Sequence, residues 1–233
     1  MGTPGYFWYN RGMKIILGSW GLSTEPIIKA CEELVGKNRK DINMAIINEA
    51  INGEPGDHRW FVEELEHLSS TIGGNLEFID IQVHPISYAK ERIAEADVVY
   101  CFGGSADYLA NTFFKTGFDK LVPEIIENKV WVGSSAGSCV LCHKESEEIQ
   151  KAVFKEKREV ERFLDIVPIV FLPHLHGFFK FDKEEVKKAS GFTDLPVYAL
   201  SDETAIVING DEPLRVIGED YIIAKKGEIY GKS

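Results

Sequence analysis

One serine in the sequence has neighbours that are typical of a catalytic nucleophile. Ser135 lies in the middle of a Gly-x-Ser-x-Gly pattern that runs from Gly133 to Gly137. The apolar run 130–132 predicts a buried strand before this pattern, and Ala136–Leu141 predicts a helix directly after it. A serine at such a strand–turn–helix junction is presented on a strained turn, where glycines two residues away on either side prevent clashes. The pattern therefore predicts nucleophilic catalysis, whereas small residues that only allow close helix packing are the alternative reading.

A serine hydroxyl is a weak nucleophile, so the site also needs a base that a third group orients. Six histidines compete for this role. His174 and His176 follow the apolar run 166–172, where the end of a strand would present an active-site base. We expect His176 to point elsewhere if this segment is extended, which favours His174.

Two acidic residues and a pair of glycines complete the candidate site. Asp202 and Glu203 follow the predicted strand 197–200, and either carboxylate could orient the histidine. A glycine turn ending at Gly104 follows another apolar run, which brings it to the same edge of a parallel sheet. The backbone N–H groups of Gly104 and Ala136 would then form an oxyanion hole, because glycine lets a substrate carbonyl approach closely.

These motifs together resemble the dipeptidase E and cyanophycinase family of serine peptidases, over roughly residues 13 to 210. The matching segments are Gly103–Gly104 with a small polar residue, Gly133–Gly137, Val167-Pro168 leading to Pro173-His174, and Leu200–Ala205. The resemblance implies a serine peptidase that forms an acyl-enzyme at Ser135, with His174 as the base. In the Asp-Glu-Thr-Ala form of the family the glutamate orients the histidine, which makes Glu203 the first choice and Asp202 the second. The implied substrates are small peptides, especially dipeptides with an acidic N-terminal residue.

The sequence departs from the family pattern near the nucleophile. Family members commonly have Asn after the paired glycines, where this chain has Ser105, and many have a bulky residue where it has Ser134. Both serines are therefore candidate substrate-binding residues. An acidic substrate also requires a cation, for which Lys180 is a candidate. The basic residues that flank the His174 segment are Arg158, Arg162, Lys180 and Lys183. Leu172-Pro173 replaces the Asp-Gln typical of cyanophycinases, so a dipeptidase fits better.

Composition excludes several function classes. The net charge of -11 argues against nucleic acids and anionic membrane surfaces as main partners. Apolar runs stay short of a membrane span, and we find no secretory signal, metal-ligand spacing, phosphate loop or dinucleotide fingerprint. We therefore expect a cytoplasmic enzyme without a cofactor, whose partner is a small peptide and which could form a homodimer. Four cysteines are expected to be reduced thiols, namely Cys31, Cys101, Cys139 and Cys142.

Strands that alternate with helices predict one α/β domain over residues 13–233, and residues 1–12 look like a start-site extension or a cloning remnant. We expect a doubly wound, mostly parallel sheet with helices on both faces and an antiparallel C-terminal edge. The resemblance implies the same flavodoxin-like fold, related to class I glutamine amidotransferases. The predicted parallel strands are 14–18, 44–47, 76–83, 98–102 and 130–133. Segments 214–217 and 221–224 are predicted to form a closing hairpin.

Two other functions fit the same residues. An esterase or amidase for a small acyl compound would use the same serine chemistry. A non-catalytic binding protein would keep the scaffold without turnover. We expect a serine-reactive probe to separate the enzymes from the binding protein.

Overall fold

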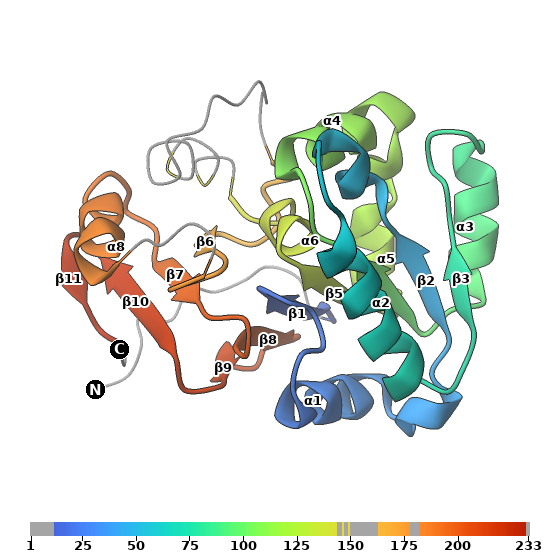
Figure 1. The fold of residues 1–233 in the computed structure, drawn as a ribbon, viewed down its shortest axis with the longest axis horizontal. Helices are drawn as coiled ribbons and strands as arrows, with labels where there is room; N and C mark the ends of the chain where they lie inside the picture. The colour runs from blue at the N-terminus through green and yellow to red at the C-terminus, as the bar shows by residue number, and fades with distance from the viewer. Residues whose placement is uncertain (1–11, 144–145, 147–148, 150–162, 178–181, 232–233) are drawn as a thin grey trace.

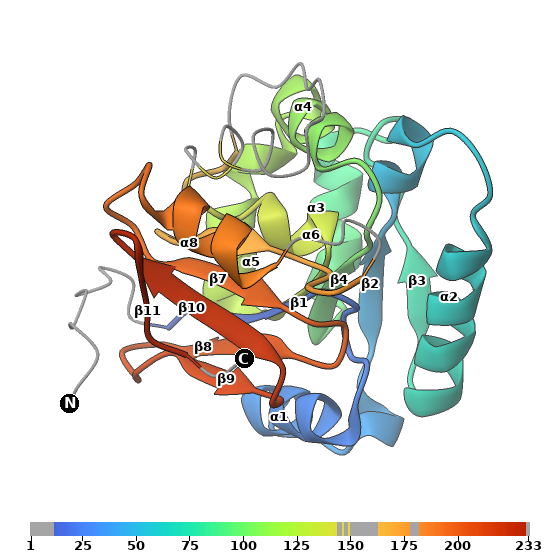
Figure 2. The same ribbon diagram turned by 60° about the vertical axis from the view of Figure 1, so that its left-hand side comes forward.

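The computed structural model describes residues 12–143, 146, 149, 163–177 and 182–231. In this part of the chain a large sheet flanked by helices carries a smaller sheet at one end (Figures 1 and 2). Most of the predicted N-terminal extension, most of segment 144–162 and Lys180 lie outside the described residues.

The large sheet has seven strands in the order β3-β2-β4-β5-β1-β8-β9. Its strands are β1 (Lys14–Gly18), β2 (Met44–Ile47), β3 (Leu76–Phe78), β4 (Val98–Cys101), β5 (Val130–Ser134), β8 (Ala205–Asn209) and β9 (Arg215–Ile217). The first five strands along the chain run parallel, whereas β8 pairs antiparallel with β1, and β9 pairs antiparallel with β8. The predicted mostly parallel α/β sheet with an antiparallel edge is therefore confirmed.

Helices cover both faces of this sheet, because its parallel strands are buried on both sides. Alternate strand residues point to opposite faces: Ile15 and Leu17 join one apolar cluster, and Ile16 joins the other. The helices of the first face are α3 (Ile86–Ala94), α4 (Ala106–Thr116), α5 (Val122–Asn128) and α6 (Ala136–Cys139). The helices of the second face are α1 (Glu25–Val35) and α2 (Arg59–Thr71). Short 3₁₀ turns lie between these elements, namely η1 (Arg39–Asp41), η2 (Glu49–Gly53) and η3 (Phe118–Lys120).

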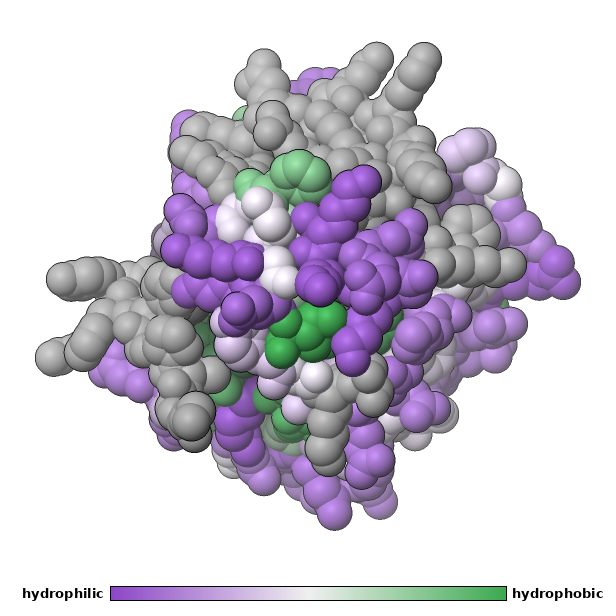
Figure 3. Space-filling view, turned by 90° about the vertical axis from the view of Figure 1, so that its left-hand side faces the viewer, coloured by the Kyte–Doolittle hydropathy of each residue, from purple (hydrophilic) through white to green (hydrophobic). Residues whose placement is uncertain are grey.

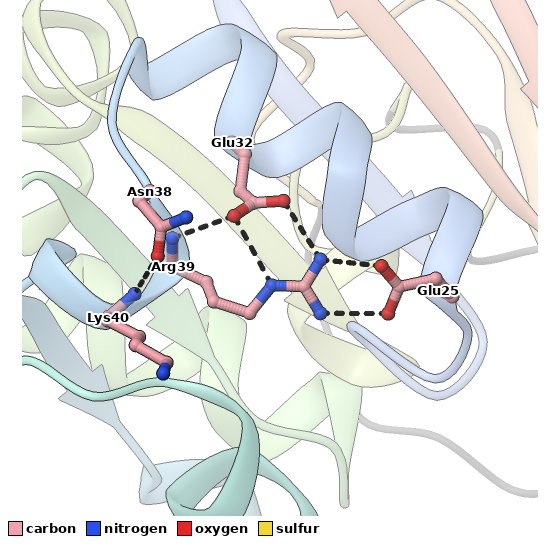
Figure 4. A network of polar contacts seen from close by, with 5 residues as sticks. All are labelled: Glu25, Glu32, Asn38, Arg39 and Lys40. Carbon is pink, nitrogen blue, oxygen red and sulfur yellow. Dashed lines mark hydrogen bonds and ion pairs between the residues drawn. The ribbon is translucent and has the colours of Figure 1, made fainter.

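An ionic network fixes the turn between α1 and β2 (Figure 4). The guanidinium of Arg39 pairs with the carboxylates of Glu25 and Glu32, and the Arg39 backbone N–H also donates to Glu32 at 2.8 Å. Asn38 caps the turn by accepting a hydrogen bond from the N–H of Lys40. Hydrogen bonds from Arg39 hold the pKa of both glutamates below its usual value. The network ties the start and middle of α1 to η1.

The smaller sheet has four strands in the order β11-β10-β7-β6. Its elements are β6 (Val170–Leu172), β7 (Val197–Leu200), β10 (Tyr221–Lys225), β11 (Glu228–Ile229) and the covering helix α8 (Lys183–Ser190). Asp182 begins α8 with a capping box, in which the Glu185 side chain accepts from the Asp182 N–H. One face of the sheet packs on α8, while Phe171 and Leu200 point into a cluster of the large sheet.

The predicted C-terminal hairpin is wrong. Strand β9 pairs with β8 in the large sheet, whereas β10 pairs with β7 in the smaller sheet. Gly218 allows this change of sheet, because its φ of 109° is open to glycine, and a Cβ there would lie 2.8 Å from the Glu203 carbonyl oxygen. The two segments are neighbours in sequence but complete different sheets.

The described surface on the side of α8 and β10 is mostly hydrophilic, with small hydrophobic areas among hydrophilic residues (Figure 3). In the part of the chain that is described, no helix combines the length and apolar character needed to cross a membrane. All four cysteines are buried thiols, and burial raises the pKa of the Cys31 thiol to about 12.

Candidate active site

Ser135 occupies a strained turn between β5 and α6. Its φ of 47° and ψ of −106° lie outside the regions that a residue with a side chain normally adopts. The backbone holds this conformation from both sides: the Ser135 N–H donates to the Gly18 carbonyl at 3.0 Å, and the Ser135 carbonyl accepts from Ser138 N–H at 2.9 Å. Such strain persists only where the surrounding structure fixes it, and it is common at functional sites.

The glycines of the Gly-x-Ser-x-Gly pattern are required by close backbone contacts. A Cβ on Gly133 would lie 2.5 Å from the Gly137 carbonyl oxygen, and one on Gly137 would lie 2.0 Å from that of Cys101. The helix predicted up to Leu141 is shorter, since α6 is a single turn. Its dipole is correspondingly small, because the dipole sums over aligned peptide units.

His174 lies between Ser135 and an acidic side chain. It follows β6, and its φ of 63° turns the chain sharply after Pro173. Its Nε2 lies 2.9 Å from Ser135 Oγ, and its Nδ1 lies 2.6 Å from Asp202 Oδ1. The imidazole is mostly buried, with 21% of the side chain exposed, whereas 54% of the Asp202 side chain is exposed. The three side chains form a continuous hydrogen-bonded series.

The preference for Glu203 over Asp202 is corrected by this geometry. The Leu175 N–H donates to the Leu200 carbonyl at 2.8 Å, which holds the turn after β6 against the end of β7. Asp202, which lies closer in sequence to Leu200 than Glu203 does, therefore contacts the imidazole. Glu203 is exposed on the same turn.

The two candidate histidines are separated in the structure. His174 reaches Ser135, whereas His176 Nε2 lies 3.6 Å from Asp220 on an exposed turn. More than half of the His176 side chain is exposed. The geometry thus agrees with the choice of His174 as the residue next to the serine.

The glycine turn after β4 lies beside the nucleophile. A Cβ on Gly103 would lie 3.2 Å from the Ser135 Cβ. Gly104 has a φ of 128°, and a Cβ on it would overlap the Ala50 backbone at 2.5 Å, so only glycine fits. Within the described ranges, the N–H groups of Gly104 and Ala136 donate no hydrogen bond. Both donors therefore remain available for a ligand.

The structure describes two of the three predicted substrate-binding residues. Ser105 caps α4, because its Oγ accepts from the Tyr108 N–H at 3.2 Å. Ser134 is 1% exposed, so it does not present its side chain at the surface in this structure. It ends β5 on the face toward α2, beside Glu64 and Tyr100. Lys180 falls outside the described residues.

A buried acid behind the nucleophile was missed. Glu64 on α2 is 2% exposed, and its Oε1 accepts from the Tyr100 hydroxyl at 2.6 Å. Burial raises the pKa of Glu64 to about 7, although the hydrogen bond from the Tyr100 hydroxyl and the nearby His174 act in the opposite direction. The signal in the sequence was the helical spacing, because Glu64 lies four residues before Leu68 on the buried stripe of α2.

An aromatic side chain also lies near the nucleophile. A Cβ on Gly103 would approach the Trp60 ring to 3.7 Å, and His58 packs edge-on against the same ring. Trp60 is only partly buried, so it offers an apolar wall close to Ser135. Within the described residues, no group of three or more His, Cys, Asp or Glu side chains could hold a metal ion.

Relatives of the chain are peptidases by name. The "uncharacterized peptidase Lmo0363" of Listeria monocytogenes is 26% identical over 161 residues, covering 66% of this chain and 76% of that protein. The "uncharacterized peptidase PM1590" of Pasteurella multocida is 19% identical over 160 residues, covering 66% and 75%.

Solved structures show the same fold. A "Putative Peptidase E Protein" from Listeria monocytogenes EGD-e matches with a TM-score of 0.68 and 22% identity, covering 88% of this chain and 98% of that one. A peptidase from an acI-B1 Actinobacterium matches with a TM-score of 0.66 and 19% identity, covering 97% and 96%.

The family model described as "Peptidase family S51" matches residues 15–216. This range includes every described residue of the Ser135–His174–Asp202 series and the glycine turn beside it. The chain therefore belongs to peptidase family S51, the dipeptidase E family.

Proposed function

We propose that this protein is a serine-type peptidase that hydrolyses small peptides through an acyl-enzyme at Ser135. The observation that carries the proposal is the hydrogen-bonded series from Ser135 Oγ through His174 to Asp202. In the neutral imidazole tautomer that carries its proton on Nδ1, the Nδ1–H donates to Asp202. The unprotonated Nε2 can then accept a hydrogen bond from the Ser135 hydroxyl.

In the proposed reaction, His174 Nε2 takes the hydroxyl proton as Ser135 Oγ attacks the peptide carbonyl carbon. The carbonyl oxygen then carries negative charge, which the N–H groups of Gly104 and Ala136 stabilise. His174 gives its proton to the leaving amine as the C–N bond breaks. A water molecule, deprotonated by the same imidazole, then attacks the acyl carbon. The ester bond to Ser135 Oγ breaks, His174 returns the proton to that oxygen, and the carboxylic acid is released.

A fluorophosphonate probe and the Ser135→Ala variant test this proposal. The wild-type protein should be labelled at Ser135 and should hydrolyse dipeptides, whereas the variant should lose both properties. Its free energy of unfolding should change by less than about 1 kcal/mol, because only one hydroxyl is removed. Peptide hydrolysis that persists in Ser135→Ala would exclude serine catalysis at this position.

We also propose that the preferred substrates are dipeptides whose N-terminal residue is acidic. This proposal is supported by the motif resemblance to dipeptidase E and by the peptidase E designation of a structural relative. It requires a cation in the substrate pocket, since a buried unpaired carboxylate is costly and the net charge of -11 repels an acidic ligand.

Three matched dipeptides test the specificity. At low salt, kcat/KM should fall by about tenfold or more from Asp-Leu to Asn-Leu, a difference of about 1.4 kcal/mol, and Ala-Leu should be no better. Equal values for all three peptides would contradict acidic specificity without affecting the proposed serine chemistry.

A further inference from the structure

The two parts of the candidate triad come from different sheets. Ser135 follows β5 of the large sheet, whereas His174 and Asp202 follow β6 and β7 of the smaller sheet. The hydrogen bond between Ser135 and His174 therefore crosses from one sheet to the other. The length of this hydrogen bond therefore depends on the contacts that hold the turn after β6 against the large sheet.

Ser19 makes such a contact. It directly follows β1, the strand next to β5, and it is 0% exposed. Its hydroxyl donates to the Leu200 carbonyl oxygen at 2.9 Å and accepts from the His174 N–H at 3.2 Å. One buried side chain of the large sheet is thus bonded to the ends of both strands that deliver the base and the acid.

The contact is made to a residue with a disfavoured backbone conformation. His174 has a φ of 63°, a conformation that side chains disfavour, so its geometry depends on the hydrogen bonds around it. The Ser19 hydroxyl accepts a hydrogen bond from the backbone N–H of this same residue. Without that hydroxyl, the His174 N–H would lose this hydrogen bond, and the turn would lose one of the contacts that fix its position.

We propose that Ser19 is a positioning residue, which holds the His174 imidazole at hydrogen-bond distance from Ser135. This inference rests on the proposed serine chemistry, because it concerns the base of that reaction. Ser19 acts through the backbone of His174. Its loss should therefore slow the chemical step more than it weakens substrate binding, since a displacement near 1 Å can reduce a rate by about 100-fold.

Ser190 provides a matched control for a Ser→Ala exchange. It is also 0% exposed, its hydroxyl donates to the Lys187 carbonyl at 2.8 Å, and it accepts from the Gly227 N–H at 3.0 Å. Both serines thus use one buried hydroxyl to join two backbone segments. Ser190 does so between α8 and the turn after β10, without contacting the His174 turn.

The experiment compares Ser19→Ala with Ser190→Ala in the full chain. Ser19→Ala should lower kcat and the rate of fluorophosphonate labelling by about tenfold or more, with KM within about twofold of wild type. Ser190→Ala should keep kcat, the labelling rate and KM within about twofold of wild type. This should hold even if its melting temperature falls as much as that of Ser19→Ala. A crystal structure of Ser19→Ala should show a Ser135 Oγ–His174 Nε2 distance beyond hydrogen-bond range.

The possible failures can be distinguished. Equal labelling rates in the two variants, or an unchanged Ser135–His174 distance in Ser19→Ala, would overturn the role of Ser19. A wild-type protein that is labelled at Ser135 but cleaves no peptide would contradict the proposed peptidase function alone. If the wild-type protein is not labelled, the crystallographic distance still decides the case for Ser19.

Discussion

The His174 imidazole makes hydrogen bonds on opposite sides, at 2.9 Å to Ser135 and 2.6 Å to Asp202. Its partner carboxylate is more than half exposed, so solvent screens the charge of Asp202. Orientation of the ring and selection of its tautomer are therefore the main contributions we expect from this acid.

The first prediction compares the two neighbouring acids. Asp202→Asn should lower kcat/KM by about 100-fold or more, because the amide can donate to Nδ1 and favour the wrong tautomer. Glu203→Gln should stay within a few fold of wild type, since Glu203 lies on the exposed side of the turn. Steady-state kinetics on one dipeptide suffice, and an equal loss in both variants would move the acid role away from Asp202.

The sequence motifs and the family resemblance pointed to the serine and the histidine that are hydrogen-bonded in the structure, but to the wrong residue of the acidic pair beside them. Gly133 and Gly137 indicate the position of Ser135, because a side chain at either glycine would clash with the backbone around the turn. Asp202 and Glu203 are adjacent, and which carboxylate meets the imidazole depends on the backbone path of a turn that neither residue type fixes. Strand alternation places Ser134 on the same face as Val132, so its burial under α2 follows once the sheet is known to be covered on both sides.

At the scale of elements, the turn around Ser135 depends on the contact between α6 and β4. Gly137→Ala would force a Cβ against the backbone oxygen of Cys101 at 2.0 Å. We expect a loss of about 1–3 kcal/mol of stability, as for other overpacked cores, together with a loss of peptidase activity.

Gly191→Ala is the control, since Gly191 has an ordinary φ of −76° and its added Cβ would lie 3.2 Å from the Lys188 carbonyl. Its stability should stay within about 0.5 kcal/mol of wild type. Urea unfolding measures both variants, and equal stabilities would show that the backbone around Ser135 can move aside.

The parallel strands were predictable because each is a short apolar run followed by a helical pattern. The second sheet was not predictable, since the strands of both sheets are short apolar runs in the sequence. Segments 215–217 and 221–225 are close in sequence, which predicts a hairpin, yet tertiary contacts divide them between two sheets. Local patterns identify strands far better than they identify partners that lie distant in the chain.

At the scale of the molecule, the buried Glu64 couples stability to pH. Its pKa is raised to about 7 in the folded protein, from 4.5 when exposed. Between these pH values the unfolded chain loses the proton that the folded protein keeps, so the stability contribution of Glu64 falls as pH rises and then levels off above about 7. The difference amounts to about 3 kcal/mol, at about 1.4 kcal/mol for each pKa unit.

Glu64→Gln removes this titration while keeping an acceptor for the Tyr100 hydroxyl. The variant should therefore lose less stability than wild type between pH 5 and pH 8, by up to about 3 kcal/mol. Chemical denaturation at the two pH values tests this, with Glu63→Gln on the exposed face of α2 as control. Parallel pH profiles for wild type and Glu64→Gln would show that Glu64 is ionised in the folded protein throughout this range.

The position of β1 sets how far the imidazole must reach. In the register of the sheet, Gly18 pairs with Ser134 on one side and with Ala205 on the other. Ser135 and the Asp202 turn therefore adjoin the two neighbours of one strand, and those neighbours lie about 10 Å apart at two inter-strand spacings. The histidine bridges the end of β1. The backbone ladder fixes the separation of β5 and β8, while the Ser19 contact holds the His174 turn at the end of β1. A substitution that moves a helix without moving β1 should therefore leave this separation unchanged.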